Sequence, residues 1–151
     1  MYWKFLKWTF GIKPTFKNGK ENGEYGEWLG RKYLKKKGFV VLYSNWRSLR
    51  DRRNEIDLIC MDQEMLVFVE VRARSENSFT TGFESLNKRK RTALLRSFKA
   101  YLREMQDCPP SYRFDVVEID LPMSGNKNVK VFHHENIAIF HESLHKRYIL
   151  K

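Results

Sequence analysis

The chain of 151 residues is 42% hydrophobic and 15% aromatic, which suits one domain with a substantial core. Its 29 lysines and arginines against 18 acidic residues give a net charge of +11, which favours a polyanionic partner, nucleic acid before an anionic membrane surface, over simple surface solubility. No apolar run approaches the roughly 18–20 residues of a transmembrane helix, and the two cysteines suggest neither a disulfide framework nor a metal-ligand set, so we expect a protein of the reducing cytoplasm.

Residues 1–22 are expected to form a basic, aromatic arm and a linker, followed by one domain over residues 23–151. Met1 to Phe10 mixes lysines with aromatic residues and lacks the apolar core of a signal peptide. This arm fits either a segment that binds a membrane surface or a partner, as a scaffold would, or a loose basic tail. Pro14 to Asn22 is polar and rich in glycine and lysine, which is typical of a linker.

The first predicted helix runs from Glu24 to Lys37, where aromatic and leucine side chains recur on one stripe. Gly38 is placed for its C-cap. A first strand is predicted from Phe39 to Trp46, followed by the basic loop Arg47 to Asn54. This loop is either a solvated turn or a phosphate-contacting loop, whose arginines would be Arg47, Arg50, Arg52 and Arg53.

A hairpin of two buried strands is predicted by the apolar runs Ile56 to Met61 and Met65 to Val71. Charged residues interrupt this pattern, with Asp57 in the first run and Glu70 and Arg72 at the end of the second. Ionised groups in a buried strand cost several kcal/mol each unless they are paired or bind a metal. The hairpin is therefore the first candidate for a functional site.

One register of this hairpin brings the charges together. If Met61 pairs with Leu66 around a four-residue loop, Asp57 opposes Glu70 and Glu55 opposes Arg72, with Cα atoms roughly 4.5–5.5 Å apart. Two facing carboxylates repel each other, and a divalent cation between them is the usual relief. The alternative is a structural ion pair, with a partner among Arg72, Arg74 and Arg113.

The second half of the chain adds a helix and two strands. Ser75 to Gly82 has no apolar periodicity and is expected to be a mobile loop. A helix is predicted from an N-cap at Asn87 to about Gln106, and strands from Tyr112 to Leu121 and from Val129 to His133. The order α-β-β-β-α-β-β predicts an α/β fold in which helices flank one mixed sheet. The expected buried stripe of the second helix is Leu94, Phe98, Tyr101, Leu102 and Met105, with Lys90 on the same stripe and pointing towards the sheet.

An ordered set of short motifs resembles the YraN-like family of uncharacterised bacterial proteins. The resemblance covers roughly Gly23 to Ala138 and implies a restriction-endonuclease-like fold, similar to Holliday-junction resolvases. The motifs are Gly26-Glu27, Tyr33-Leu34, Asn45-Trp46-Arg47, Glu55-Ile56-Asp57, Phe68-Val69-Glu70-Val71-Arg72, Lys90 and Arg113-Phe114-Asp115-Val116-Val117.

The resemblance implies a PD-(D/E)XK-type site, in which Asp57 and Glu70 hold Mg²⁺ or Mn²⁺ and Glu27 joins them. The implied activity is a metal-dependent endonuclease, a hydrolase acting on DNA more readily than on RNA, with branched or structured DNA among its substrates. Resolvase-like enzymes often pair to cut two strands, so a homodimer is also considered. Further contacts to nucleic acid are expected from Arg47, Arg50, Arg52, Arg53, Arg74, Lys88 and Arg89.

The chain departs from the family pattern at two positions. Asn54 stands where the family usually has glycine, and Arg72 stands at the motif lysine. An arginine cannot act as a base, although it can clamp a phosphate. Lys90 could supply an ammonium group instead, or it could simply extend from the helix end into solvent. The alternative function is therefore a catalytically weak or inactive nucleic-acid-binding protein.

Two other sets of polar residues are weaker candidates. Asp115 lies in an apolar strand, where it either joins a site or pairs with Arg113. The four histidines match no metal motif and are expected at the surface; they are His133, His134, His141 and His145.

Overall fold

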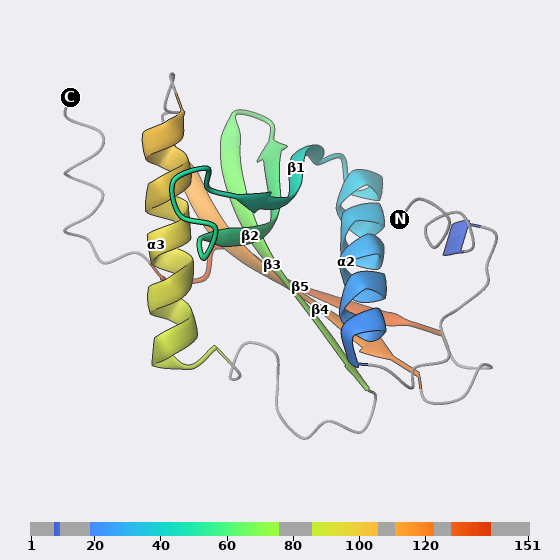
Figure 1. Cartoon of the computed structure of the whole chain (residues 1–151). Helices are drawn as coiled ribbons and strands as arrows, with labels where there is room; N and C mark the ends of the chain where they lie inside the picture. The colour runs from blue at the N-terminus through green and yellow to red at the C-terminus, as the bar shows by residue number, and fades with distance from the viewer. Residues whose placement is uncertain (1–7, 10–18, 76–85, 106–110, 123–127, 140–151) are drawn as a thin grey trace.

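The computed structural model describes residues 8–9, 19–75, 86–105, 111–122 and 128–139. In these ranges a five-stranded sheet, ordered β1-β2-β3-β4-β5, is flanked by two helices (Figure 1). The predicted mixed α/β order is confirmed, and no helix in these ranges is long and apolar enough to cross a membrane. The elements are α2 (Gly19–Lys36), β1 (Val40–Arg47), β2 (Glu55–Asp62), β3 (Met65–Ser75), α3 (Lys88–Glu104), β4 (Tyr112–Leu121) and β5 (Lys130–His134).

The two helices cover opposite faces of the sheet. Neighbouring strands are antiparallel except β3 and β4, which are parallel and joined through α3. On the α3 face Phe68 stacks on Phe98 with ring centroids 4.4 Å apart, and Phe114 packs beside them. On the α2 face Leu34 is fully buried in a second apolar cluster. Each helix therefore covers a separate apolar cluster on its face of the sheet, as the predicted apolar stripes require.

Helix α2 begins earlier and ends where predicted. Residues 19–22, assigned to the linker from sequence, belong to the helix. At its C-terminus Gly38 has φ 94°, and the Phe39 amide donates to the Leu34 carbonyl at 3.0 Å, which is a Schellman cap. The predicted arm also contributes to the fold, because Trp8 is buried against Tyr25 with ring centroids 5.2 Å apart.

Helix α3 begins at the predicted cap. The Asn87 side chain accepts a hydrogen bond from the Lys90 amide at 2.9 Å. Four residues of the predicted stripe are buried and Met105 is half-buried; the buried four are Leu94, Phe98, Tyr101 and Leu102. The predicted mobile loop lies outside the described residues, apart from Ser75 at the end of β3.

The predicted register of the β2–β3 hairpin is confirmed from Met61–Leu66 to Ile59–Phe68. The loop is shorter than expected, because Asp62 also pairs with Met65. That leaves a two-residue turn whose first residue, Gln63, has φ 54°. Pairing ends at Leu58 with Val69, so the two expected pairs beyond it, Asp57 with Glu70 and Glu55 with Arg72, are not formed and that part of the predicted register is wrong. Beyond this point β2 pairs with β1 alone and β3 with β4 alone.

Candidate active site

The candidate site lies where β2 and β3 part. Asp57 directly precedes Leu58, the first residue of β2 that pairs with β3, and its Oδ2 accepts a hydrogen bond from the Val71 amide at 2.8 Å. The carboxylate thus provides the acceptor that a neighbouring strand would otherwise supply to β3. Figure 1 shows β3 running away from β2 beyond this point and continuing beside β4. The parted strands hold Asp57 at a fixed place beside Glu70 and Val71.

Glu70 is the most enclosed acid of the site. It is only 3% exposed and lies on the α3 face of β3, beyond the aromatic core. Its Oε1 is 2.8 Å from Lys90 Nζ and 3.2 Å from Arg72 Nε. The prediction that Lys90 points towards the sheet is therefore confirmed. A buried carboxylate with two cations on one oxygen is compensated, which explains how the sheet tolerates it.

Asp57 carries the most perturbed carboxyl group of the site. Burial, followed by the negative charge of Glu70, raises its pKa to about 8. Glu27 also raises this pKa, whereas the Val71 amide and the positive charge of Lys90 lower it. A carboxyl group whose ionisation is opposed by a neighbouring carboxylate favours a cation bound beside it.

Glu27 reaches the same region from α2. Its Oε2 accepts a hydrogen bond from Asn45 Nδ2 at 2.6 Å. Burial raises the pKa of Glu27, and the charges of Glu55 and Glu70 act in the same direction. Asn45 is in the left-handed region with φ 53°, a conformation that asparagine tolerates better than most residues. No separate role was predicted for Asn45, and its hydrogen bond identifies it as the residue that orients Glu27.

The carboxylate groups of the site are of the chemical type that binds Mg²⁺. No three acidic, histidine or cysteine side chains of the described ranges are already arranged to hold a metal ion. Mg²⁺ does not require such a cage, since it is usually held by one or two carboxylates and completes its shell with waters and substrate phosphates. Asp57 and Glu70 supply two carboxylates, and the Glu70 charge is one cause of the raised pKa of Asp57.

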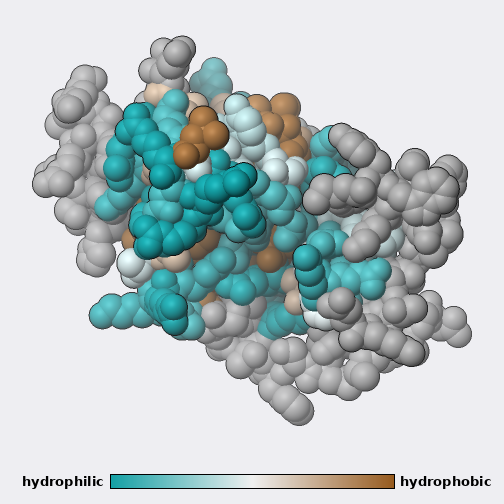
Figure 2. All heavy atoms as spheres, viewed as in Figure 1, coloured by the Kyte–Doolittle hydropathy of each residue, from teal (hydrophilic) through white to brown (hydrophobic). Residues whose placement is uncertain are grey.

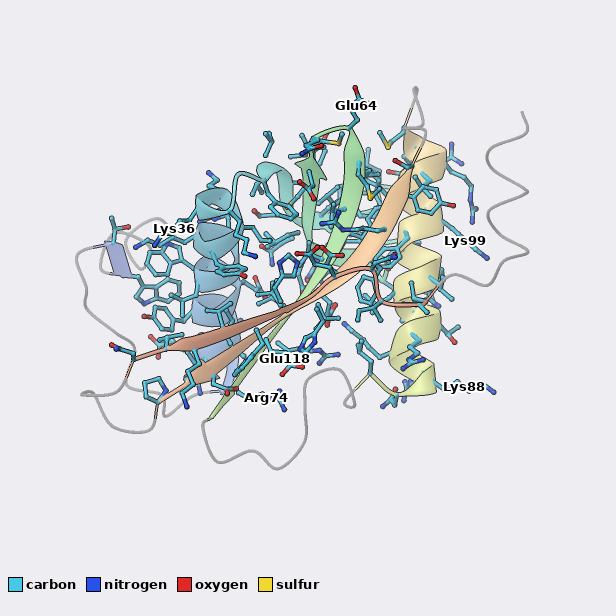
Figure 3. The ribbon with its side chains drawn as sticks, turned by 180° about the vertical axis from the view of Figure 1, so that it is seen from behind. Lys36, Glu64, Arg74, Lys88, Lys99 and Glu118 are labelled. Atoms are coloured by element: carbon cyan, nitrogen blue, oxygen red, sulfur yellow. The ribbon has the colours of Figure 1, made fainter. Side chains whose placement is uncertain are left out.

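Three other residues predicted to contact phosphate lie on α3 and β3. Lys88 and Arg89 are exposed at the start of α3, near Lys90. Arg74 contacts the buried Glu118, and both lie towards the end of β3 in Figure 3, far from Glu64 in the hairpin turn.

Two arginines of the basic loop before β2, Arg47 and Arg53, form ion pairs with nearby acids. Arg47 Nη2 is 2.8 Å from Glu55 Oε2, and Arg53 Nε is 2.9 Å from Asp51 Oδ1. Arg50 and Arg52 are exposed on the same loop. Asn54 is 6% exposed and accepts from Arg96 Nε at 2.8 Å. Its side chain therefore anchors the loop to α3, which accounts for asparagine at this position.

Asp115 belongs to a separate, structural network. It pairs with Val69 on the α2 face, whereas Glu70 is on the α3 face. Its carboxylate is fully buried and contacts Arg113 Nε and His133 Nε2, each at 3.0 Å. The expectation of surface histidines is wrong for His133, whose side chain is 3% exposed; it holds for His134 only in part, at 38%. His141 and His145 lie outside the described residues.

Comparison with known proteins gives the same family across most of the chain. The model of the uncharacterised protein family UPF0102 matches residues 26–119, which include every acid of the site. A UPF0102 protein of Carboxydothermus hydrogenoformans is 35% identical over 123 residues, covering 82% of this chain and 99% of the relative. One from Alkaliphilus oremlandii is 37% identical over 119 residues, covering 78% and 97%. The chain therefore belongs to the UPF0102, or YraN, family.

Proposed function

We propose that this protein is a metal-dependent endonuclease that hydrolyses phosphodiester bonds in DNA, with branched or structured DNA as its preferred substrate. The observation that carries the proposal is the pair Asp57 and Glu70 at the parting of β2 and β3, with Lys90 and Arg72 on Glu70. A structural ion pair alone would not need two further acids, Glu27 and Asp57, close enough for the charge of Glu70 to raise their pKa values.

The residues have distinct roles in this proposal. Asp57 and Glu70, with Glu27 beside them, would hold Mg²⁺, which when bound activates water and offsets charge on the phosphate. Lys90 and Arg72 carry the cationic groups that orient a phosphate, and arginine does so through a planar fork. Asn45 keeps Glu27 directed at the site. The Val71 amide keeps Asp57 in place whether or not the carboxyl group is protonated.

Cleavage of plasmid, single-stranded and four-way-junction DNA with Mg²⁺ or Mn²⁺ tests the proposal. Glu70→Gln and Asp57→Asn should each abolish cleavage, because each removes a charged metal ligand. Glu64→Gln is the matched control, since Glu64 is exposed in the turn at the other end of the hairpin. Cleavage that survives in both site variants would contradict the assignment.

One observation favours a second candidate, a nucleic-acid-binding protein without catalysis. Arg72 occupies the motif-lysine position, and it shares Glu70 Oε1 with Lys90, so the acid is neutralised without a metal. This candidate predicts salt-dependent DNA binding with no affinity for Mn²⁺. Calorimetric titration with Mn²⁺ separates the two. Binding that is present in the wild type and in Glu64→Gln but lost in Glu70→Gln excludes the second candidate.

A further inference from the structure

The loop of residues 48–54 is anchored at both ends on α3. Ser48 is 2% exposed, and its Oγ donates to Glu104 Oε1 at 2.6 Å. The same oxygen accepts from the amides of Arg50 at 3.2 Å and Asp51 at 3.3 Å. At the other end the Ser48 amide donates to the Asn54 carbonyl at 3.1 Å, which closes the loop. These hydrogen bonds therefore hold the tip of the loop in a defined conformation.

The tip of this loop presents an apolar side chain to solvent. Leu49 is 94% exposed, the highest value among the large hydrophobic residues of the described ranges, and Leu42 on β1 is 42% exposed. A single exposed leucine needs no explanation by itself. Leu49 differs because the loop fixes it next to Arg50 and close to Arg52, both exposed. Figure 2 shows that this face, where the loop crosses in front of α3 in Figure 1, is mainly hydrophilic.

The position of the loop relates Leu49 to the acids. The loop leads directly into β2, whose third residue is Asp57. The Glu55 amide donates to Ser97 Oγ at 3.2 Å, so the start of β2 is anchored on the same helix as the loop. Lys90, which contacts Glu70, is also on that helix. The loop that carries Leu49, the start of β2 and Glu70 therefore all contact the same helix.

We propose that Leu49 is a wedge that enters the base stack of bound DNA, while Arg50 and Arg52 bind the phosphates on either side. Proteins that kink DNA commonly insert a leucine or another apolar side chain between bases and use flanking cations on the backbone. The inference rests on the proposed DNA binding and refines its substrate class. Insertion costs least where bases are already unstacked, so DNA with a branch point, nick or mismatch is favoured over a continuous duplex.

The wedge is tested with DNA that contains 2-aminopurine, whose fluorescence rises when it is unstacked, placed in turn at successive positions around a branch point. Without divalent metal, the full-length protein should raise the fluorescence at one or two positions. Leu49→Ala should lose this rise and bind about tenfold more weakly, because apolar surface that was buried in the complex is missing. Leu49→Met should retain the signal, since methionine is also an apolar wedge. Leu42→Ala, the same truncation outside the loop, should behave as wild type.

The outcomes separate this inference from the proposed function. Equal fluorescence and affinity for Leu49→Ala and wild type would overturn the wedge and leave the nuclease proposal standing. A wedge signal without cleavage by the wild type would support the wedge and overturn the nuclease. Absence of DNA binding by the wild type would overturn both.

Discussion

Replacing Asp57 by asparagine should stabilise the protein, and more so at high pH. Asparagine keeps an acceptor for the Val71 amide and removes a carboxylate that is opposed by burial and by Glu70. The folded state raises the pKa of Asp57 from 3.8 to about 8. Folded protein therefore retains a proton that the unfolded chain releases, so the free energy of unfolding of the wild type falls as the pH rises between these two values.

The magnitude follows from the same values. A pKa that moves from 3.8 to about 8 sets an upper limit of roughly 6 kcal/mol, at about 1.4 kcal/mol per pKa unit. Asp57 is half-buried and solvent screens it in part, so we expect Asp57→Asn to gain about 2–4 kcal/mol at pH 9. The gain should be about threefold smaller at pH 5, because the loss of wild-type stability builds up from the unfolded pKa of 3.8 towards about 8, and pH 5 lies only a short way along this interval.

Urea denaturation of wild type and variant at pH 5 and pH 9 measures this gain, and taking their difference cancels groups that titrate alike in both proteins. Glu64→Gln, at an exposed position, should show no such dependence on pH. A variant that is less stable than wild type at pH 9, or a difference that does not change with pH, would refute the reasoning. The expected result would also mean that the site is maintained at a cost to stability, as is common for functional residues.

Three further predictions concern packing, the structural network and the motif position. Gly26→Ala should lower the free energy of unfolding by about 1–3 kcal/mol, because a Cβ there would overlap the Cβ of Ala73. Gly23→Ala, on the open side of α2, should raise the free energy of unfolding by about 0.5–1 kcal/mol. Thermal denaturation compares the two variants. Asp115→Asn should cost about 3–5 kcal/mol, because Arg113 loses its fully buried carboxylate partner and His133 loses a charged hydrogen-bond partner. Urea denaturation at pH 7 would detect this loss, and an unchanged midpoint would contradict the network. Arg72→Lys should raise cleavage with Mg²⁺ at least tenfold by restoring the motif lysine, measured as initial rates on junction DNA; a lower rate would show that the guanidinium is the better phosphate ligand.

Sequence reasoning placed most elements because periodicity alone determines them. Strand β4 has the predicted bounds, and the Asn87 cap fixes the start of α3. The hairpin register was predictable since a slip of one residue would turn its buried side chains to the wrong face. The start of α2 was not predictable in the same way, because residues 19–22 are polar and the helix there makes no buried stripe to read.

The arrangement of the candidate residues was predictable only in part. Lys90 contacts Glu70 as expected, because alternation in β3 and the stripe of α3 direct both side chains to one face. Asp57 is near enough for Glu70 to raise its pKa, but the two residues are not paired across the strands as predicted. The point at which β2 and β3 separate was not predictable, because the hydrophobic pattern of a strand does not indicate where its pairing with a neighbouring strand ends. Asn45 was missed for a related reason: its contact with Glu27 joins α2 to β1, and no local periodicity records it.

The hydrogen bond from the Val71 amide to Asp57 makes a single backbone proton a spectroscopic reporter of the acid. That amide is protected from exchange with solvent by a side chain rather than by a neighbouring strand. Its exchange rate and its nuclear magnetic resonance shift therefore follow the position and protonation of Asp57 directly. The effects of ligands, metals and pH on the site can therefore be compared through this one resonance.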